Sequence, residues 1–130
     1  MLTGRTIDGF QEVFQSSFLG HFLLTKLLLD LIEATDGARV INLSSLMHRF
    51  GSTDWEGAAL GSGKGYLDLA SMGINPAGYA DAKMAQLLFA EELRRRFHER
   101  HVNAMAIAVH PGTVKTEVWR SAPFIVRPFL

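Results

Sequence analysis

Hydrophobic residues recur at helical spacing through the first part of the chain. They are Phe10, Val13, Phe14, Phe18, Phe22, Leu23, Leu27, Leu28 and Leu31. Spacings of three and four residues place such side chains on one face of an α-helix. Asp8 is the predicted N-cap of this helix, with Gln11 as its reciprocal partner. Gly37 is predicted to end the helical segment. The pattern therefore predicts one long helix over residues 9–34.

Two short apolar runs predict buried strands. The first is Ala38–Ser44 and the second is Val102–Val109. In the first run Val40, Ile41 and Leu43 are almost continuous, which is typical of a strand covered on both faces. We therefore expect both strands to lie inside the fold.

A second helix is predicted between the two strands. Asn75–Pro76 forms a helix start, with Asn as the cap and Pro at the first helical position. Glu91 and Glu92 precede Arg95 and Arg96 by four residues, which favours ion pairs on a solvated face. The apolar side is marked by Ala80, Met84, Leu87, Leu88, Leu93 and Phe97.

The order helix, strand, helix, strand indicates an α/β fold. A strand, a crossover helix and a second strand form a right-handed unit with parallel strands. We predict an open α/β sheet with two adjacent parallel strands. Ligands bind beyond the carboxyl ends of such strands, here Ser44–Ser45 and His110–Thr113. Residues 46–78 hold seven of the twelve glycines and are predicted to be a long functional or mobile loop.

Composition excludes several classes of protein. The 130 residues suffice for one domain, and 13 Lys and Arg balance 13 Asp and Glu, so no basic field favours a nucleic-acid partner. Without cysteine there is no disulfide or thiolate chemistry. His98 and His101 lack partners at ligand spacing, so no metal site is predicted.

The sequence predicts neither a secretory signal nor a membrane span. The first ten residues lack an apolar core of the kind that signal peptides have. The most apolar window, residues 18–32, is interrupted by His21, Lys26 and Asp30, which argues against a transmembrane segment. We expect a chain that is not secreted, and leave open whether it is cytoplasmic or peripheral to an intracellular membrane.

Tyr79 and Lys83 lie four residues apart in the first turns of the second predicted helix, on one face. A phenol has an ordinary pKa of about 10, and a nearby ammonium favours its ionised form. The pair is a candidate general acid, although this spacing is common on helices.

Five segments give the pair a wider context. They are Asp8–Phe10, Phe14–Thr25, Arg39–Ser45, Tyr79–Phe89 and His110–Thr116. In this order they resemble the short-chain dehydrogenase/reductase family, particularly its retinol-dehydrogenase-like branch. The resemblance implies hydride transfer between NAD or NADP and a small lipophilic carbonyl or alcohol substrate, such as a retinoid or steroid.

The resemblance also implies roles for individual residues. Tyr79 would be the general acid, Lys83 would favour its ionised form and bind the nicotinamide ribose, and Ser45 would orient the substrate oxygen. The nicotinamide end would lie against Pro111, Gly112, Val114 and Thr116. Without the resemblance, Ser44 is a buried strand-end hydroxyl and Pro111–Gly112 an ordinary turn.

Two features depart from the family pattern. Ser17 stands where the family has an Asn that links the lysine to a water in a proton relay. The glycine-rich turn for the cofactor pyrophosphate is also missing, and Gly61–Gly65 does not have the spacing of a phosphate loop.

The resemblance therefore implies that residues 1–130 form a partial Rossmann-like (doubly wound) NAD(P)-binding domain, the catalytic half without the pyrophosphate-binding half. Alone, the chain is expected to be inactive or weakly active, and either to self-associate or to dock on a full-length relative. The alternative is a non-catalytic truncated product that associates with a full-length relative through its long helices.

Overall fold

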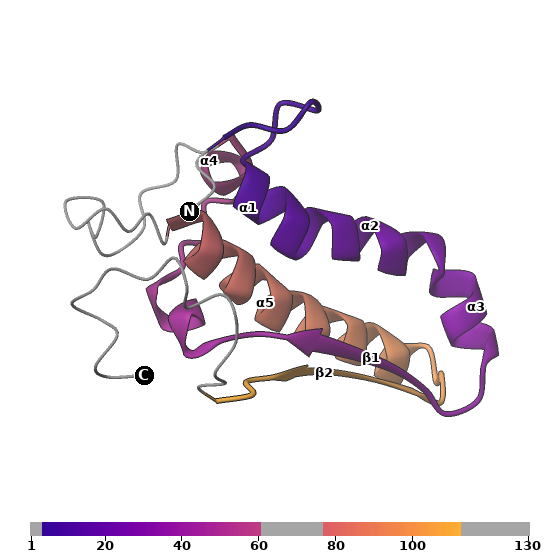
Figure 1. Ribbon diagram of the computed structural model, residues 1–130. Coiled ribbons are helices and arrows are strands. Elements are labelled where there is room, and N and C mark those ends of the chain that lie inside the picture. Colours follow the sequence, from indigo (N-terminus) through magenta and orange to yellow (C-terminus); the bar gives the residue numbers. More distant parts are fainter. Residues whose placement is uncertain (1–3, 61–76, 113–130) are drawn as a thin grey trace.

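The computed structural model describes residues 4–60 and 77–112 as a helical layer and a two-stranded sheet (Figure 1). The first helical stretch comprises α1 (Glu12–Phe14), the π-helical η1 (Gln15–Leu19), α2 (Gly20–Leu27) and α3 (Leu29–Ala34). There follow strand β1 (Ala38–Leu43), the 3-10 helix η2 (Leu46–Phe50), α4 (Trp55–Leu60), α5 (Ala77–Glu99) and strand β2 (Ala104–Val109).

The two strands confirm the predicted α/β class. β1 and β2 pair in parallel, in register from Ala38 opposite Ala104 to Leu43 opposite Val109. β1 is one residue shorter than predicted, and β2 begins at Ala104 rather than at Val102. At the start of the sheet, the Gly37 amide donates to the Asn103 carbonyl at 2.8 Å, which fixes where pairing begins.

The predicted first helix is present but segmented, and its predicted cap is wrong. The helix begins at Glu12, and the Gln11 side chain caps it by accepting from the Phe14 amide at 2.6 Å. Gly9 has a φ of +85°, which turns the backbone between Asp8 and the helix. Asp8 instead accepts from the Gln15 side chain at 2.7 Å.

The end of this helical stretch agrees with the prediction. α3 ends at Ala34, and Gly37 follows with a φ of +68°, the left-handed conformation that glycine adopts without strain.

The sheet is covered on one face only within the described residues. α5 packs against both strands, and Figure 1 shows it between the sheet and the helices α1 and α2. On β1 the side chains of Ile41 and Leu43 are 56% and 57% exposed. The prediction of strands buried on both faces is therefore wrong here, because no described element lies over the second face.

Two apolar clusters hold the helices together. In one, Phe14 packs with Ala58, Ala82 and Ala85. In the other, Leu93 and Phe97 of α5 pack on Ala106 of β2. A row of aromatic rings joins the helical stretch to α5, with Phe22 and Phe89 centroids 5.1 Å apart and Phe18 and Phe89 centroids 6.2 Å apart.

The buried side of α5 differs in part from the predicted one. Ala80, Leu93 and Phe97 are buried as expected, but Leu88 is largely exposed. The closest packing uses small residues, Ala82, Ala85 and Ala90, which allow the neighbouring elements to approach the helix.

The predicted long loop is partly helical. Residues 46–60 contain η2 and α4, and residues 61–76, together with the predicted Asn75–Pro76 cap, lie outside the described residues. Ser45 caps η2 by accepting from the Met47 amide at 3.3 Å. Asp54 accepts from the Gly57 amide at 2.9 Å at the start of α4. These side-chain caps form helical turns that the glycine count alone did not predict.

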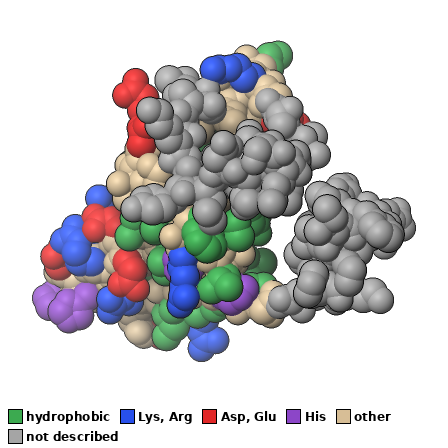
Figure 2. All heavy atoms as spheres, turned by 90° about the vertical axis from the view of Figure 1, so that its left-hand side faces the viewer, with side chains coloured by type: hydrophobic (Ala, Val, Ile, Leu, Met, Phe, Trp, Pro, Cys, Tyr) green, Lys and Arg blue, Asp and Glu red, His purple; other side chains and the backbone are tan. Residues whose placement is uncertain are grey.

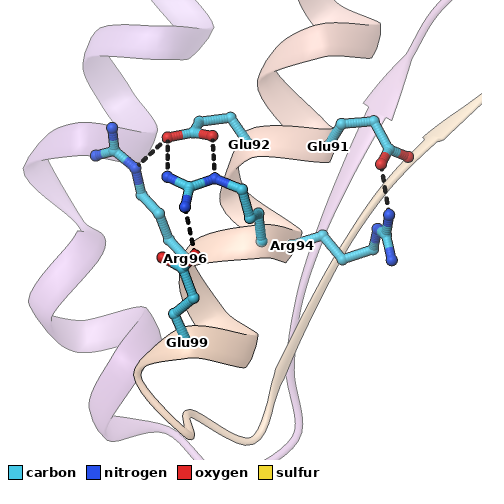
Figure 3. Close-up of polar contacts among 6 residues, drawn as sticks. Glu91, Glu92, Arg94, Arg96 and Glu99 are labelled. Atoms are coloured by element: carbon cyan, nitrogen blue, oxygen red, sulfur yellow. Dashed lines mark hydrogen bonds and ion pairs between the residues drawn. The ribbon is translucent and has the colours of Figure 1, made fainter.

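The exposed face of α5 carries ion pairs, of which Glu92–Arg96 was predicted and the others were not (Figure 3). Glu92 accepts from Arg95 and Arg96, each at 2.7 Å, and Glu91 pairs with Arg94 rather than with Arg95. The hydrogen bonds from Arg95 and Arg96 lower the pKa of Glu92 to about 2.

Within the described residues, no helix is both long enough and apolar enough to cross a membrane.

Removing a core ring should destabilise the fold far more than removing an exposed leucine. Phe97 is 1% exposed, whereas Leu31 is 65% exposed. We expect Phe97→Ala to lower the free energy of unfolding by about 3–5 kcal/mol, because it leaves a cavity. Leu31→Ala should change it by less than about 0.5 kcal/mol. Urea unfolding followed by circular dichroism measures both, and equal losses would contradict the packing described above.

Candidate active site

The carboxyl ends of the strands and the first turns of α5 meet at one end of the molecule. In Figure 1 both strands run toward the end from which α5 begins, and Figure 2 looks onto that end. Hydrophobic side chains gather there around basic and histidine side chains. The residues predicted to carry the chemistry come from these elements.

Tyr79 and Lys83 lie together on one side of α5. The Lys83 ammonium nitrogen is 5.3 Å from the centroid of the Tyr79 ring, within the range of a cation–π contact. Both side chains are half-buried. The arrangement sets a positive charge beside a phenol.

Two bonds fasten Lys83 to the end of β1. Its ammonium donates to the Leu43 carbonyl at 2.6 Å. In return, the Ser44 hydroxyl donates to the Lys83 backbone carbonyl at 2.9 Å. Burial lowers the pKa of the Lys83 ammonium, because a charge loses hydration inside the fold. Ser44 thus joins the strand to the helix, as expected of a strand-end hydroxyl.

Ser45 lies at the junction of β1 and η2. Its half-buried hydroxyl accepts from the Met47 amide, and its carbonyl oxygen lies 2.6 Å from His48 Nδ1. Gly51, after η2, lies directly against α5. A Cβ there would lie 2.6 Å from the Ala80 carbonyl oxygen, so glycine allows the segment after Ser45 to lie beside the turn of Tyr79.

Ser17 lies within η1, and its backbone carbonyl, not its hydroxyl, connects it to the site. The Ser17 carbonyl accepts from the Gln86 side chain at 2.5 Å and lies 3.1 Å from His21 Nδ1. Gln86 in turn accepts from the Lys83 ammonium at 3.0 Å. The sequence analysis missed Gln86, although a polar residue three positions after Lys83, on a helix side predicted to be apolar, could have indicated it.

The cofactor-side residues are only partly described. Pro111 and Gly112 follow β2 and are exposed. Gly112 has a φ of +78°, and a Cβ on it would meet no atom of the described residues within 4 Å. Val114 and Thr116 lie outside the described residues.

Asp81 is a buried carboxyl between Tyr79 and Lys83 in sequence. One of its oxygens accepts from the Ser52 amide at 2.6 Å, and the other has no partner among the described residues. Burial is the main cause of its raised pKa, with a further contribution from the nearby Asp54. Asp81 therefore fastens the segment after η2 to the start of α5.

A cleft of about 510 Å³ runs beside Lys83 on the side of η1 and α2. Five consecutive residues of β1, Arg39–Leu43, line it, as the edge of a strand does, with Ser17, Lys83 and Gln86 at one end. Tyr79 and Ser45 are not among its lining residues. The cleft therefore follows the edge of β1 that is unpaired in the described structure.

In residues 4–60 and 77–112, no three His, Asp or Glu side chains converge to hold a metal ion.

Comparison with known proteins gives the same family as the motifs. The chain is 40% identical to human retinol dehydrogenase 13 over 116 residues, which are 88% of the chain and 32% of the relative. It is 39% identical to mouse retinol dehydrogenase 12, over 91% of the chain and 34% of the relative. It is 36% identical to human retinol dehydrogenase 11, over 93% and 35% respectively.

A solved structure agrees with these relatives. An uncharacterized protein from Mycobacterium paratuberculosis superposes with a TM-score of 0.66 at 33% identity, over 91% of this chain and 40% of that one. No protein-family model matches the chain. The resemblance to the retinol-dehydrogenase-like branch of the short-chain dehydrogenases/reductases is confirmed, as is the Rossmann-like fold class. The chain spans about a third of the length of these relatives.

Asp81 should make stability fall as the pH rises. Its pKa in the folded chain is raised above the ordinary value of 3.8, so the folded state holds this proton more tightly than the unfolded state. That contribution is complete below pH 3.8 and is lost as the pH passes through the raised pKa. The Asp81→Asn variant has no ionisable side chain at this position, so its stability does not fall in this way as the pH rises.

The difference in unfolding free energy, wild type minus Asp81→Asn, should therefore decrease with rising pH. The decrease should be about 1.4 kcal/mol for each unit that separates the two pKa values. Urea unfolding from pH 3 to pH 7 measures it. A difference that stays constant over this range would mean that Asp81 is not a buried acid.

Proposed function

We propose that this chain carries the catalytic residues of a short-chain dehydrogenase/reductase that transfers hydride between NAD or NADP and a carbonyl or alcohol. The observation that carries the proposal is the position of the Lys83 ammonium. It donates to the Leu43 carbonyl and lies 5.3 Å from the centroid of the Tyr79 ring. The similarity of the chain to retinol dehydrogenases over most of its length supports it. Residues 1–130 would be a partial NAD(P)-binding domain, the half that holds these residues.

Tyr79 would donate the proton that a carbonyl oxygen receives during reduction. The phenolate left behind is stabilised by the adjacent ammonium, which lowers the energy of proton transfer. Ser45 would hold the same substrate oxygen. Its hydroxyl oxygen accepts from the Met47 amide through one lone pair, so its proton remains available to donate to the substrate oxygen.

The residues on the cofactor side fit a nicotinamide nucleotide. An ammonium has three N–H donors, and Leu43 and Gln86 take two of those of Lys83, so a ribose hydroxyl could accept the third. Gly112 has a φ of +78° just after β2, where the nicotinamide end would lie with Pro111, Val114 and Thr116. When bound, the nicotinamide supplies or accepts the hydride.

The substrate class is proposed to be a small lipophilic carbonyl or alcohol, such as a retinoid or a steroid. The names of the relatives, which are retinol dehydrogenases, support this choice. For the 130 residues alone we expect weak turnover or none, because no glycine-rich pyrophosphate turn is present in the sequence.

Removing the phenolic hydroxyl should abolish carbonyl reduction. We expect Tyr79→Phe to lower kcat by at least about 100-fold, the usual contribution of a general acid. Lys83→Met should have a similar effect, whereas Lys26→Met, on the exposed surface of α2, should have none. Because the 130 residues alone are expected to turn over weakly or not at all, the chain is joined to the pyrophosphate-binding half of a full-length relative, and oxidation of NADPH or NADH with a lipophilic aldehyde then measures all three. Full activity in Tyr79→Phe would contradict the mechanism.

A second candidate function is a non-catalytic one, docking on a full-length relative through the long helices. It is favoured by the exposed leucines of α2 and α3, above all Leu27, whose side chain is 73% exposed. Together with the cleft along β1, they form an apolar surface that one partner could cover. A second copy of the chain is the simplest alternative occupant.

This candidate predicts an interaction that depends on α2. Leu27→Glu should weaken co-purification with a tagged full-length relative, or self-association, by at least about tenfold, because it buries a charge. Arg94→Glu, on the exposed face of α5, is the control and should leave association unchanged. A chain that stays monomeric and binds no relative, while reducing carbonyls, would leave only the first candidate.

A further inference from the structure

The side chain of Gln86 is a buried amide, and its hydrogen bonds need an explanation. It is 4% exposed, in a part of α5 where Ala82, Ala85 and Ala90 are also buried. A buried carboxamide is unfavourable unless its oxygen and nitrogen both find partners. Here both partners belong to the candidate site.

The carboxamide joins Lys83 to the backbone of η1. Its oxygen accepts from the Lys83 ammonium at 3.0 Å, and its nitrogen donates to the Ser17 carbonyl at 2.5 Å. The opposite orientation would set an N–H donor against the ammonium and an oxygen against the carbonyl. The two partners therefore fix the orientation of the amide.

The backbone of η1 is suited to this contact. η1 is a π-helical turn within a longer helical stretch, a local widening that is frequent at functional sites. Its Ser17 carbonyl faces the side chains of Gln86 and His21. On its other side, Gln86 contacts β1 through its own backbone, since its backbone carbonyl accepts from the side-chain nitrogen Nδ2 of Asn42 at 3.5 Å. Gln86 thus connects η1, α5 and β1 at one point.

We propose that Gln86 is a positioning residue for Lys83, linking its ammonium to the Ser17 carbonyl. With the Leu43 carbonyl, the Gln86 oxygen provides two fixed acceptors that hold the ammonium beside Tyr79. A direct side-chain bridge thereby joins the lysine to the helix position where the family pattern has an Asn and this chain has Ser17. The catalytic consequence rests on the proposed function, whereas the positioning of Lys83 does not.

The electrostatic effect of Gln86 can be measured on Lys83 itself. An acceptor that bonds to an ammonium favours its charged form, which counteracts the effect of burial. Gln86→Met keeps the length of the side chain but offers no comparable acceptor. Gln86→Glu keeps the oxygen and adds a negative charge. If Gln86 acts on the ammonium, the two substitutions should move its titration in opposite directions.

The titration would be followed by NMR on the 130-residue chain labelled in the lysine side chains, with neither cofactor nor substrate. The chain has four lysines, and Lys83→Arg identifies the signal. We expect Gln86→Met to lower the pKa of Lys83 by about one unit, and Gln86→Glu to raise it by about one unit. Gln15→Leu is the control, because the Gln15 amide bonds to Asp8 instead, and it should leave Lys83 unchanged.

The outcomes separate the possibilities. Unfolding would move the pKa of Lys83 up toward its ordinary value, so a fall in Gln86→Met cannot arise from a loss of structure. If Gln86→Met does not fold, the rise in Gln86→Glu, with its amide spectrum intact, decides the question. An unchanged Lys83 in a folded variant overturns the proposal.

The proposed function fails separately. If Lys83 responds to Gln86 but carbonyl reduction does not depend on Tyr79, the oxidoreductase proposal is wrong and the positioning role remains. If carbonyl reduction depends on Tyr79 but the pKa of Lys83 is unchanged by substitution of Gln86, only the positioning role is rejected.

Discussion

The docking of α5 on the end of β1 is the contact on which the site depends. The Lys83 ammonium donates to the Leu43 carbonyl, and the Ser44 hydroxyl donates to the Lys83 carbonyl. These reciprocal bonds fix the axial position of the helix relative to the strand. A shift of one helical turn would move Tyr79 by about 5 Å, which is more than a proton transfer tolerates.

Other features reinforce the same junction. Gly51 lets the segment after Ser45 lie against α5, and Asp81 ties that segment to the first turns of the helix. Gln86 extends the junction to η1. The polar contacts that join α5 to β1, η1 and the segment after η2 therefore lie in its first half, whereas Leu93 and Phe97 pack on β2 in its second half. The sheet provides the frame, and the loops and first helical turns at its carboxyl end carry the residues that we propose to be catalytic.

Much of the fold follows from local sequence patterns. The parallel pair of strands and the helix end at Gly37 are predictable, because apolar runs and glycine act over short distances. The N-cap was not, because Asp8 and Gln11 compete for it and the left-handed Gly9 decides the outcome. The short helices over residues 46–60 depend on side-chain caps from Ser45 and Asp54, which no periodicity reveals.

The site was predictable only through motifs. The spacing of Tyr79 and Lys83 places them on one face, but the position of the ammonium depends on a carbonyl forty residues earlier in sequence, that of Leu43. The proposed role of Gln86 is likewise a tertiary effect, since its partner Ser17 lies in η1, 69 residues earlier in sequence. The open face of β1 could not be predicted, because apolar residues on a strand do not specify what covers them.

The bond between Lys83 and Leu43 can be observed directly. A chain labelled with nitrogen-15 in the lysine side chains and carbon-13 at the leucine carbonyls should show a scalar coupling across the hydrogen bond from Lys83 Nζ to the Leu43 carbonyl. Its detection, with loss in Lys83→Met, would establish that the helix is held by the strand end. A folded chain with intact β1–β2 amide contacts, but a freely rotating Lys83 and no coupling, would contradict this architecture.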